Sequence, residues 1–243
     1  MKHFNLVDVA FLLVARFDSI QRLENAIVVS EYLCENFDTN VYLWEFDSYN
    51  NGFYSLLKPN AVTYSFITDD DPVFHRTRHI NQLIGQIKEK FISIWDIDVI
   101  APPNQVYKSV ELLRNGIDFV YPYNHLFLDT SNVLRNEFVR SRSIEILESY
   151  KAFMNELYPP NPVGGAFFAN KDSYNTCGKE NELFYGWGIE DGERISRWLR
   201  HKMNIKRIEG PLFHLSHPRG INSQTFSNYD SLIKERIRQS AIN

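Results

Sequence analysis

Two aspartates, Asp96 and Asp98, stand two positions apart inside the apolar run 92–100, Ile-Ser-Ile-Trp-Asp-Ile-Asp-Val-Ile. We expect this run to be a strand of a central sheet, where side chains two positions apart lie on the same side. Carboxylates at the end of a buried strand are costly without a cation or several hydrogen-bond donors. The pair therefore predicts an Asp-x-Asp site for a divalent metal, at the sheet edge where α/β proteins bind ligands. The alternative is a strand-end turn with two solvated acids.

A second candidate is the pair His214 and His217, which follows a predicted strand and precedes Pro-Arg-Gly. Imidazole and carboxylate ligands together suit a borderline ion such as Mn²⁺ better than Ca²⁺, which prefers oxygen ligands alone. Taken by themselves, the two histidines are as compatible with an ordinary surface as with a metal site.

The third candidate is segment 185–191, Tyr-Gly-Trp-Gly-Ile-Glu-Asp. The glycines permit close backbone approach to a ligand, and the flat face of Trp187 suits a sugar ring. Glu190 or Asp191 could act as a general base. A structural interpretation, in which both acids complement the dipole at a helix N-terminus, is compatible with this role.

A basic turn between Phe74 and Asn81 is the fourth candidate. Arg76 and Arg78 stand two positions apart there, and guanidinium groups bind phosphates in a bidentate manner. Seen alone, such a turn is more often plain surface.

The composition is that of a soluble globular enzyme. The chain has 243 residues, 44% hydrophobic and 23% charged, and its net charge of −4 offers no basic footprint for nucleic acid. Cys34 and Cys177 form neither a disulfide framework nor a Cys-x-x-Cys metal spacing, which favours a reducing compartment. Segment 7–15 is too short to span a bilayer and lacks signal-peptide features. We expect a cytoplasmic protein without a transmembrane segment, and peripheral association with a membrane stays open.

The elements that position these residues open with a β-α-β unit, which favours a parallel sheet. Segments 9–15 and 40–45 are the strands, and Asp18 or Ser19 caps the helix between them. Further expected elements are a loop over 49–60, a strand over 62–67, a helix from Phe74, a helix over 105–115, a strand over 119–123, a helix-rich cover over 131–157, a helix over 192–203, a strand over 205–208 and a terminal helix packed on the outside.

Together these segments resemble the metal-dependent glycosyltransferases of GT-A fold. The resemblance is closest to the β-1,4-galactosyltransferase family and the related catalytic region of the polypeptide N-acetylgalactosaminyltransferases. Four motifs carry it in the family's order over about residues 8–220: segment 95–102 at the Asp-Val-Asp-Leu-Ile-Pro metal motif, Phe74 to Asn81 at Phe-Asn-Arg-Ala-Lys-x-x-Asn, Gly164-Gly165 with segment 186–191 at Gly-Gly and Gly-Trp-Gly-Gly-Glu-Asp, and His214 to His217 at Met-x-x-His.

The resemblance implies an α/β protein of GT-A fold, with a Rossmann-like, mixed and mostly parallel sheet flanked by helices. It implies one domain over residues 1–243, with a nucleotide-binding half (1–125), an acceptor and catalytic half (126–220) and a C-terminal helix (221–243). The implied activity is transfer of galactose, N-acetylgalactosamine or glucose from a UDP-sugar to a glycan acceptor hydroxyl, with Mn²⁺ or Mg²⁺. The implied acceptor is an oligosaccharide or lipid-linked glycan in polysaccharide biosynthesis.

The family's roles carry over to matching positions. For the metal, the resemblance implies Asp98 and His217 as ligands, His214 as a third in place of the family methionine, and Asp96 at the donor ribose or the metal's water shell. For the substrates, it implies Arg16, Phe74 and Arg76 at the uridine diphosphate, Gly164 and Gly165 at the donor sugar, Trp187 at the acceptor sugar, and Glu190 and Asp191 at the acceptor hydroxyl or the hexose, with Asp191 as the base.

Some positions depart from the family pattern. Segment 14–18 lacks the family's proline and second arginine, and Ile189 replaces the glycine before the acid pair. Retaining relatives have Glu-Asn where this chain has Glu190-Asp191, and a carboxylate there favours inversion. The alternatives are a retaining transferase on the same scaffold, a metal-dependent nucleotidyltransferase or phosphohydrolase, and a catalytically idle sugar-binding module.

Overall fold

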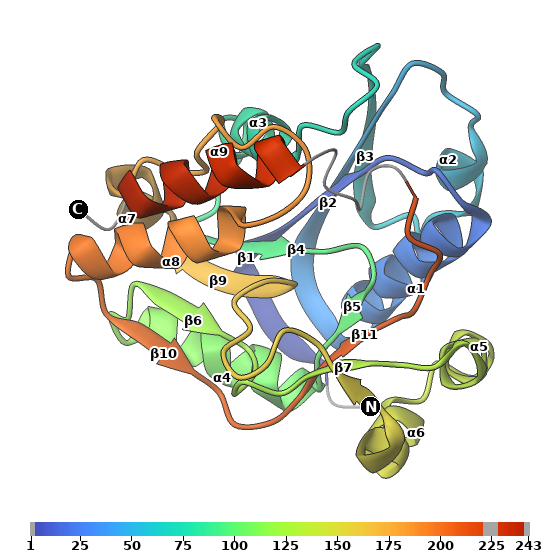
Figure 1. Cartoon of the computed structure of the whole chain (residues 1–243). Coiled ribbons are helices and arrows are strands. Elements are labelled where there is room, and N and C mark those ends of the chain that lie inside the picture. The colour runs from blue at the N-terminus through green and yellow to red at the C-terminus, as the bar shows by residue number, and fades with distance from the viewer. Residues whose placement is uncertain (1–2, 221–227, 241–243) are drawn as a thin grey trace.

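The fold contains two β-sheets and surrounding helices, in a computed structural model that describes residues 3–220 and 228–240 (Figure 1). The strands are β1 (Phe4–Ala15), β2 (Phe37–Asp47), β3 (Val62–Thr68), β4 (Phe91–Trp95), β5 (Val99–Ile100), β6 (Phe119–Tyr121), β7 (Phe127–Asp129), β8 (Asn155–Glu156), β9 (Ala166–Asn170), β10 (Ile205–Arg207) and β11 (Leu212–His214). The helices are α1 (Ile20–Asn36), α2 (Phe53–Leu57), α3 (Arg76–Ile84), α4 (Pro103–Arg114), α5 (Asn132–Ser141), α6 (Ile144–Tyr150), the short 3₁₀ helix η1 (Lys151–Phe153), α7 (Lys171–Thr176), α8 (Glu190–Arg200) and α9 (Asn228–Ser240). The predicted α/β class is confirmed.

Parallel pairing dominates the larger sheet, whose strand order is β10-β6-β9-β4-β1-β2-β3. β1 pairs in parallel with β2 and β4, whereas β9 runs antiparallel between β4 and β6. The predicted β-α-β opening is confirmed, and the Ser19 hydroxyl caps α1 by accepting from the backbone N–H of Arg22. Residues 9–15 are all buried, as expected for a parallel strand covered on both faces. The smaller sheet has the order β5-β11-β7-β8.

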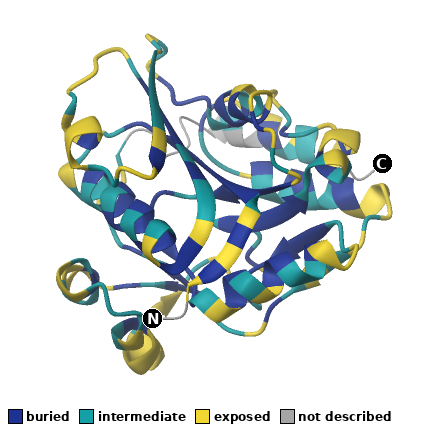
Figure 2. Ribbon diagram, turned by 180° about the vertical axis from the view of Figure 1, so that it is seen from behind, coloured by how far each residue is buried: buried dark blue, intermediate teal, exposed yellow. Residues whose placement is uncertain are grey.

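Aromatic side chains fill the core around β4 and α8. Trp95 meets Phe11 and Phe168 edge-on, with ring centroids 5.4 and 5.9 Å apart. Trp198 of α8 stacks on Phe119 at 3.8 Å. The buried residues in Figure 2 follow the strands and the inner faces of the helices. This packing fixes two elements, β4 and α8, whose ends carry the acids singled out in the sequence.

Asp96 and Asp98 lie in a turn, so the predicted continuous strand over 92–100 is wrong. β4 ends at Trp95, and β5 begins at Val99 in the other sheet. The indole N–H of Trp95 donates to the Val99 carbonyl at 2.9 Å and closes the turn. The physical reason is that a packed strand interior offers no partners for two carboxylates, whereas a turn between two sheets brings them to polar neighbours.

Other elements differ from expectation at their edges. The expected loop over 49–60 contains the short helix α2, and the expected helix over 192–203 begins earlier, at Glu190. The terminal helix is confirmed over residues 228–240, whereas 221–227 and 241–243 of the expected segment lie outside the described residues. In the part of the chain that the structure describes, no helix combines the length and apolar character needed to cross a bilayer.

Candidate active site

A pocket of about 430 Å³ opens at the carboxyl ends of β1 and β4, next to the Asp96–Asp98 turn. Its walls come from segments that are far apart in sequence. Of the residues predicted for the site, all but Arg16 line it: Phe74, Arg76, Asp96, Asp98, Gly164, Gly165, Trp187, Glu190, Asp191, His214 and His217. The four motifs therefore meet at one place.

Backbone hydrogen bonds hold the acid turn against its neighbours. The Asp96 N–H donates to the Gly165 carbonyl at 2.8 Å, and the Leu215 N–H donates to the Asp98 carbonyl at 2.7 Å. The Tyr123 hydroxyl donates to the Gly164 carbonyl, also at 2.8 Å. The two glycines and the histidine segment are thus fixed relative to the acids.

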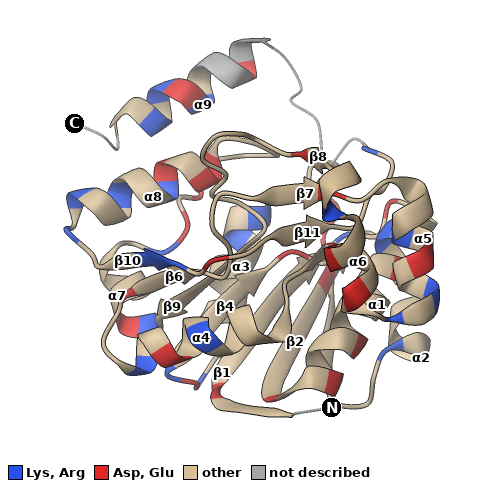
Figure 3. Cartoon of the chain, turned by 90° about the horizontal axis from the view of Figure 1, so that it is seen from below, with Lys and Arg blue, Asp and Glu red and all other residues tan. Residues whose placement is uncertain are grey.

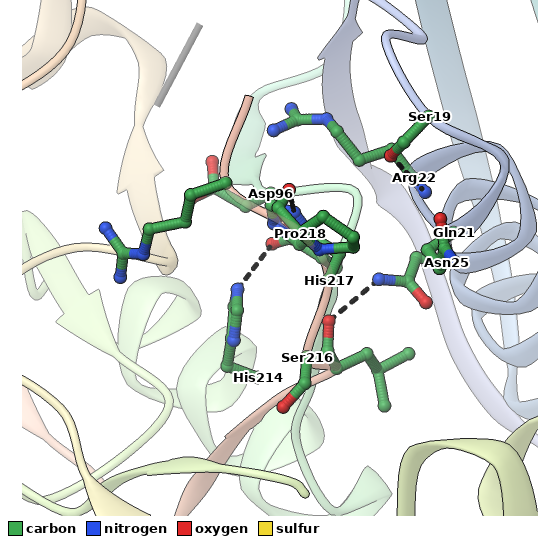
Figure 4. A network of polar contacts seen from close by, with 12 residues as sticks. Ser19, Gln21, Arg22, Asn25, Asp96, His214, Ser216, His217 and Pro218 are labelled. Atoms are coloured by element: carbon green, nitrogen blue, oxygen red, sulfur yellow. Dashed lines mark hydrogen bonds and ion pairs between the residues drawn. The ribbon is translucent and has the colours of Figure 1, made fainter. Parts of the chain in front are cut away.

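Asp98, His214 and His217 form a cluster that could hold a metal ion. One ligand atom from each lies within 4.8 Å of the others. The Nε2 atom of His217 is 3.1 Å from one carboxylate oxygen of Asp98, and the Nε2 atom of His214 is 3.9 Å from the other. Figure 4 shows both imidazoles beside the turn that carries Asp96. One carboxylate and two imidazoles suit a borderline divalent ion.

Further contacts fix the orientation of both histidine rings. The Nδ1 atom of His214 is 2.7 Å from Asp129, and the Ser216 hydroxyl donates to the same carboxylate at 2.8 Å. The Nδ1 atom of His217 is 2.9 Å from the Pro218 carbonyl. Because Nδ1 is engaged in both rings, Nε2 faces Asp98, which is how metal-binding histidines are oriented in proteins. Asp129 was missed in the sequence, since only the pairing of β7 with β11 places it opposite His214.

The charges of this cluster favour an ionised Asp98. Burial raises the pKa of its carboxyl, but the hydrogen bond with His217 and the charges of both histidines outweigh burial, so the pKa lies well below its usual range. Burial lowers the pKa of His217, but its hydrogen bond with Asp98 and the charge of that carboxylate raise it, for a net increase. Asp98 is therefore a carboxylate at neutral pH, the form that binds a cation.

Asp96 pairs with Arg76 on the other side of the turn. The guanidinium of Arg76 lies 2.5 Å from a carboxylate oxygen of Asp96. Burial raises the pKa of Asp96, and Arg76 offsets only part of that effect. Arg76 is at the first turn of α3 and lines the pocket, so it can contact both Asp96 and an anionic ligand.

The acids at the start of α8 have distinct surroundings. One oxygen of Asp191 accepts a hydrogen bond from Arg194, which is buried and also pairs with Glu180 at 3.0 Å. The other oxygen, Oδ2, faces Gly164, where an added Cβ would lie 2.6 Å from it. Burial, followed by the charge of Asp191, raises the pKa of Glu190 to about 7. The two neighbouring carboxyls therefore differ: Arg194 binds and orients the carboxylate of Asp191, whereas burial favours the neutral form of the Glu190 carboxyl.

The loop that carries Trp187 has an unusual backbone. Gly186, Gly188 and Ile189 have φ angles of 75°, 109° and 72°. Positive φ is costly for a β-branched residue such as Ile189, and such conformations concentrate at functional sites. The guanidinium of Arg219 lies 5.6 Å from the Trp187 ring centre and donates to the Tyr158 hydroxyl at 3.0 Å.

Arg16 has other partners. Its guanidinium donates to the Phe46 carbonyl at 2.9 Å and to the Asp71 carbonyl at 2.8 Å, and it pairs with Asp69 at 3.2 Å. These contacts hold the 69–71 segment against β2, so a contact between Arg16 and a nucleotide stays a prediction. Three cations that the sequence did not single out do line the pocket: Arg22, Arg219 and Lys234.

Comparisons with known proteins concern the family and the fold. Residues 149–219 match a family model described as the N-terminal domain of galactosyltransferase. No curated protein matches the chain. The fold is similar to the catalytic domain of Drosophila beta1,4galactosyltransferase 7 in complex with xylobiose, with a TM-score of 0.56 and 14% identity over 96% of this chain and 79% of that one.

A second similar structure is the mannosyltransferase PcManGT from Pyrobaculum calidifontis, in complex with GDP-Man and Mn²⁺. Its TM-score is 0.55, with 11% identity over 88% of this chain. The match spans 58% of the length of that protein. At these identities the similarity concerns the fold, and it confirms the predicted sheet architecture.

Proposed function

We propose that this chain, which has the GT-A fold of these two transferases, is a metal-dependent glycosyltransferase. It moves a hexose from a UDP-sugar to a glycan hydroxyl with inversion of configuration. The observation that carries the proposal is the meeting of two groups in one pocket. These are the Asp98, His214 and His217 cluster and an oriented carboxylate, Asp191, beside Gly164.

The ligand set of the cluster suits Mn²⁺, whereas Mg²⁺, the other ion expected from the sequence, prefers oxygen ligands. Asp98, His217 and His214 would hold the ion, with both imidazoles oriented through Nδ1. When bound, such an ion supplies positive charge that stabilises a leaving diphosphate. Arg76 adds charge from the protein itself, because its guanidinium lines the same pocket.

Asp191 is the proposed general base. Arg194 holds one of its oxygens, and the other faces Gly164, where the donor sugar is expected. The acceptor hydroxyl gives its proton to Asp191 while its oxygen attacks the anomeric carbon. The bond from that carbon to the diphosphate breaks on the opposite face, and its electron pair leaves with UDP. An attack from the face opposite the leaving group would invert the anomeric configuration.

Glu190 has a different proposed role. Its pKa of about 7 leaves a large protonated fraction near neutral pH, so it can donate a hydrogen bond to a sugar hydroxyl. Trp187 and the adjacent glycines would form the wall against the acceptor sugar. The proposed acceptor is an oligosaccharide or lipid-linked glycan, and the proposed location is the cytoplasm.

The test is a donor screen with purified protein in Mn²⁺ or EDTA. A panel of UDP- and GDP-sugars is assayed by thermal shift and by release of nucleoside diphosphate. Metal-dependent stabilisation by UDP and turnover of one UDP-sugar are expected. No response to any nucleotide with metal present would refute the proposal. GDP-sugars are included because the similar mannosyltransferase is in complex with GDP-Man.

The products separate the alternatives. A nucleotidyltransferase or phosphohydrolase releases pyrophosphate or phosphate, and an idle sugar-binding module releases nothing. The anomeric configuration of the product, measured by NMR, distinguishes inversion from retention.

A further inference from the structure

The C-terminal helix α9 contributes a buried cation to the pocket. Lys234 is 2% exposed and lines the pocket, although the family-model match ends at residue 219. Its Nζ atom pairs with Asp230 at 3.1 Å, one turn earlier on the helix. α9 packs against α8, and Figure 3 shows the two helices side by side. Burying an ammonium group costs free energy unless it is paired and hydrogen-bonded, so a second partner besides Asp230 helps to offset that cost.

That second partner belongs to the tryptophan loop. Lys234 donates to the Trp187 carbonyl at 2.7 Å. The loop around this carbonyl has positive φ angles at Gly186, Gly188 and Ile189 and lies outside regular secondary structure up to the start of α8. A charge-assisted hydrogen bond at its centre is a strong constraint on a loop of this kind.

We propose that α9 is part of the active-site wall and that Lys234 is a positioning residue for the Trp187 loop. The ammonium group fixes the Trp187 carbonyl, and the Trp187 ring is thereby held over the pocket near Arg219. The expected change in KM rests on the proposed function, whereas the expected change in the Trp187 loop does not.

The test compares Lys234→Met with Lys234→Arg and with Arg236→Met. Met removes the charge and the donors at similar length, whereas Arg retains both. Arg236 is an exposed cation on the same helix, so its substitution is the matched control. If Lys234→Met does not fold, Lys234→Leu takes its place with the same expectations.

Acrylamide quenching of tryptophan fluorescence measures the loop without any ligand. Trp44, Trp95 and Trp198 are buried, whereas Trp187 is partly exposed and dominates the quenching. Quenching should rise in Lys234→Met, stay unchanged in Arg236→Met and return toward the original value in Lys234→Arg. The rise should vanish in a Trp187→Phe background. Equal quenching in Lys234→Met and the unsubstituted protein would overturn the inference.

Kinetics with a donor found by the screen supply the second measurement. Loss of a charge-assisted hydrogen bond should shift the loop equilibrium by about tenfold, which raises KM by up to about tenfold and changes kcat little. A purely structural role would change neither KM nor kcat, and an unchanged KM would contradict the inference. If the screen finds no donor, the proposed function fails while the quenching result still decides the role of Lys234.

Discussion

Replacing Gly164 with alanine should disable the proposed base without unfolding the protein. An added Cβ would lie 2.6 Å from Oδ2 of Asp191 and 3.4 Å from its Cγ, and no other described atom beyond the neighbouring residues of the chain lies within 4 Å. The carboxylate must therefore move by roughly 0.8 Å to restore an ordinary contact, and misplacement of about 1 Å can cost about a hundredfold in rate. Its other oxygen is bound to Arg194, which restricts that movement.

The assay is kcat for sugar transfer in Gly164→Ala, with Gly85→Ala as the matched control. An added Cβ at Gly85 meets its nearest atom at 3.4 Å, an ordinary contact, so the control should retain its activity. We expect kcat to fall by about a hundredfold in Gly164→Ala, with a melting temperature close to that of the control.

A double-mutant cycle identifies the cause of that loss. In an Asp191→Ala background the obstructed oxygen is absent, so Gly164→Ala should have little further effect on the remaining rate. An equal loss in both backgrounds would show that the Cβ obstructs the donor sugar and not the base. Normal turnover in the single variant would refute the geometric reasoning altogether.

Three further predictions concern charge and metal. Asp129→Asn should weaken Mn²⁺ binding by about 10 to 100-fold, measured by calorimetry, because Asp129 orients His214; unchanged affinity would contradict this role. Mn²⁺ affinity of the unsubstituted protein should rise with pH, since the raised pKa of His217 lets protons compete with the ion; a flat profile would argue against His217 as a ligand. Burial raises the pKa of Glu190 to about 7 in the folded protein, above its value in the unfolded chain. The stability that the protonated side chain contributes is therefore fully present below the pKa of the unfolded chain and is lost as the pH rises through 7. In Glu190→Gln this loss of unfolding free energy, about 3 kcal/mol, should be absent when stability is measured by urea titration of the metal-free protein over this pH range. The same pH dependence in both proteins would oppose the assignment of the raised pKa to Glu190.

The sequence predicted the parts of this molecule that depend on local pattern. Apolar runs identified β1, β2 and β3, and the possible caps Asp18 and Ser19 marked the start of α1, where the structure has Ser19. The site segments were recognisable because packing alone gives little reason for their residue types. The two glycines on either side of Trp187 are an example.

What the sequence could not predict depends on contacts between distant segments. Asp129 became recognisable only through the pairing of two short strands, and Lys234 only through the packing of α9 on α8. The turn at Asp96 looked like a strand because its apolar neighbours belong to two different sheets. Periodicity does not report where a chain passes from one sheet to another.

The antiparallel strand β9 has a consequence for how such a protein can change over time. Because β9 runs opposite to β4, the hydrogen bond from Asp96 to Gly165 joins two points that are 69 positions apart in the chain. The excursion between them includes α5 and α6, whose surfaces are largely exposed. Of this excursion, Asp98, Tyr123 and Asp129 contact the site, whereas the residues of α5 and α6 do not line the pocket, so insertions or deletions within these two helices should leave the hydrogen bond between Asp96 and Gly165 in place. Sequence change can therefore accumulate in α5 and α6 while the proposed chemical centre is inherited intact.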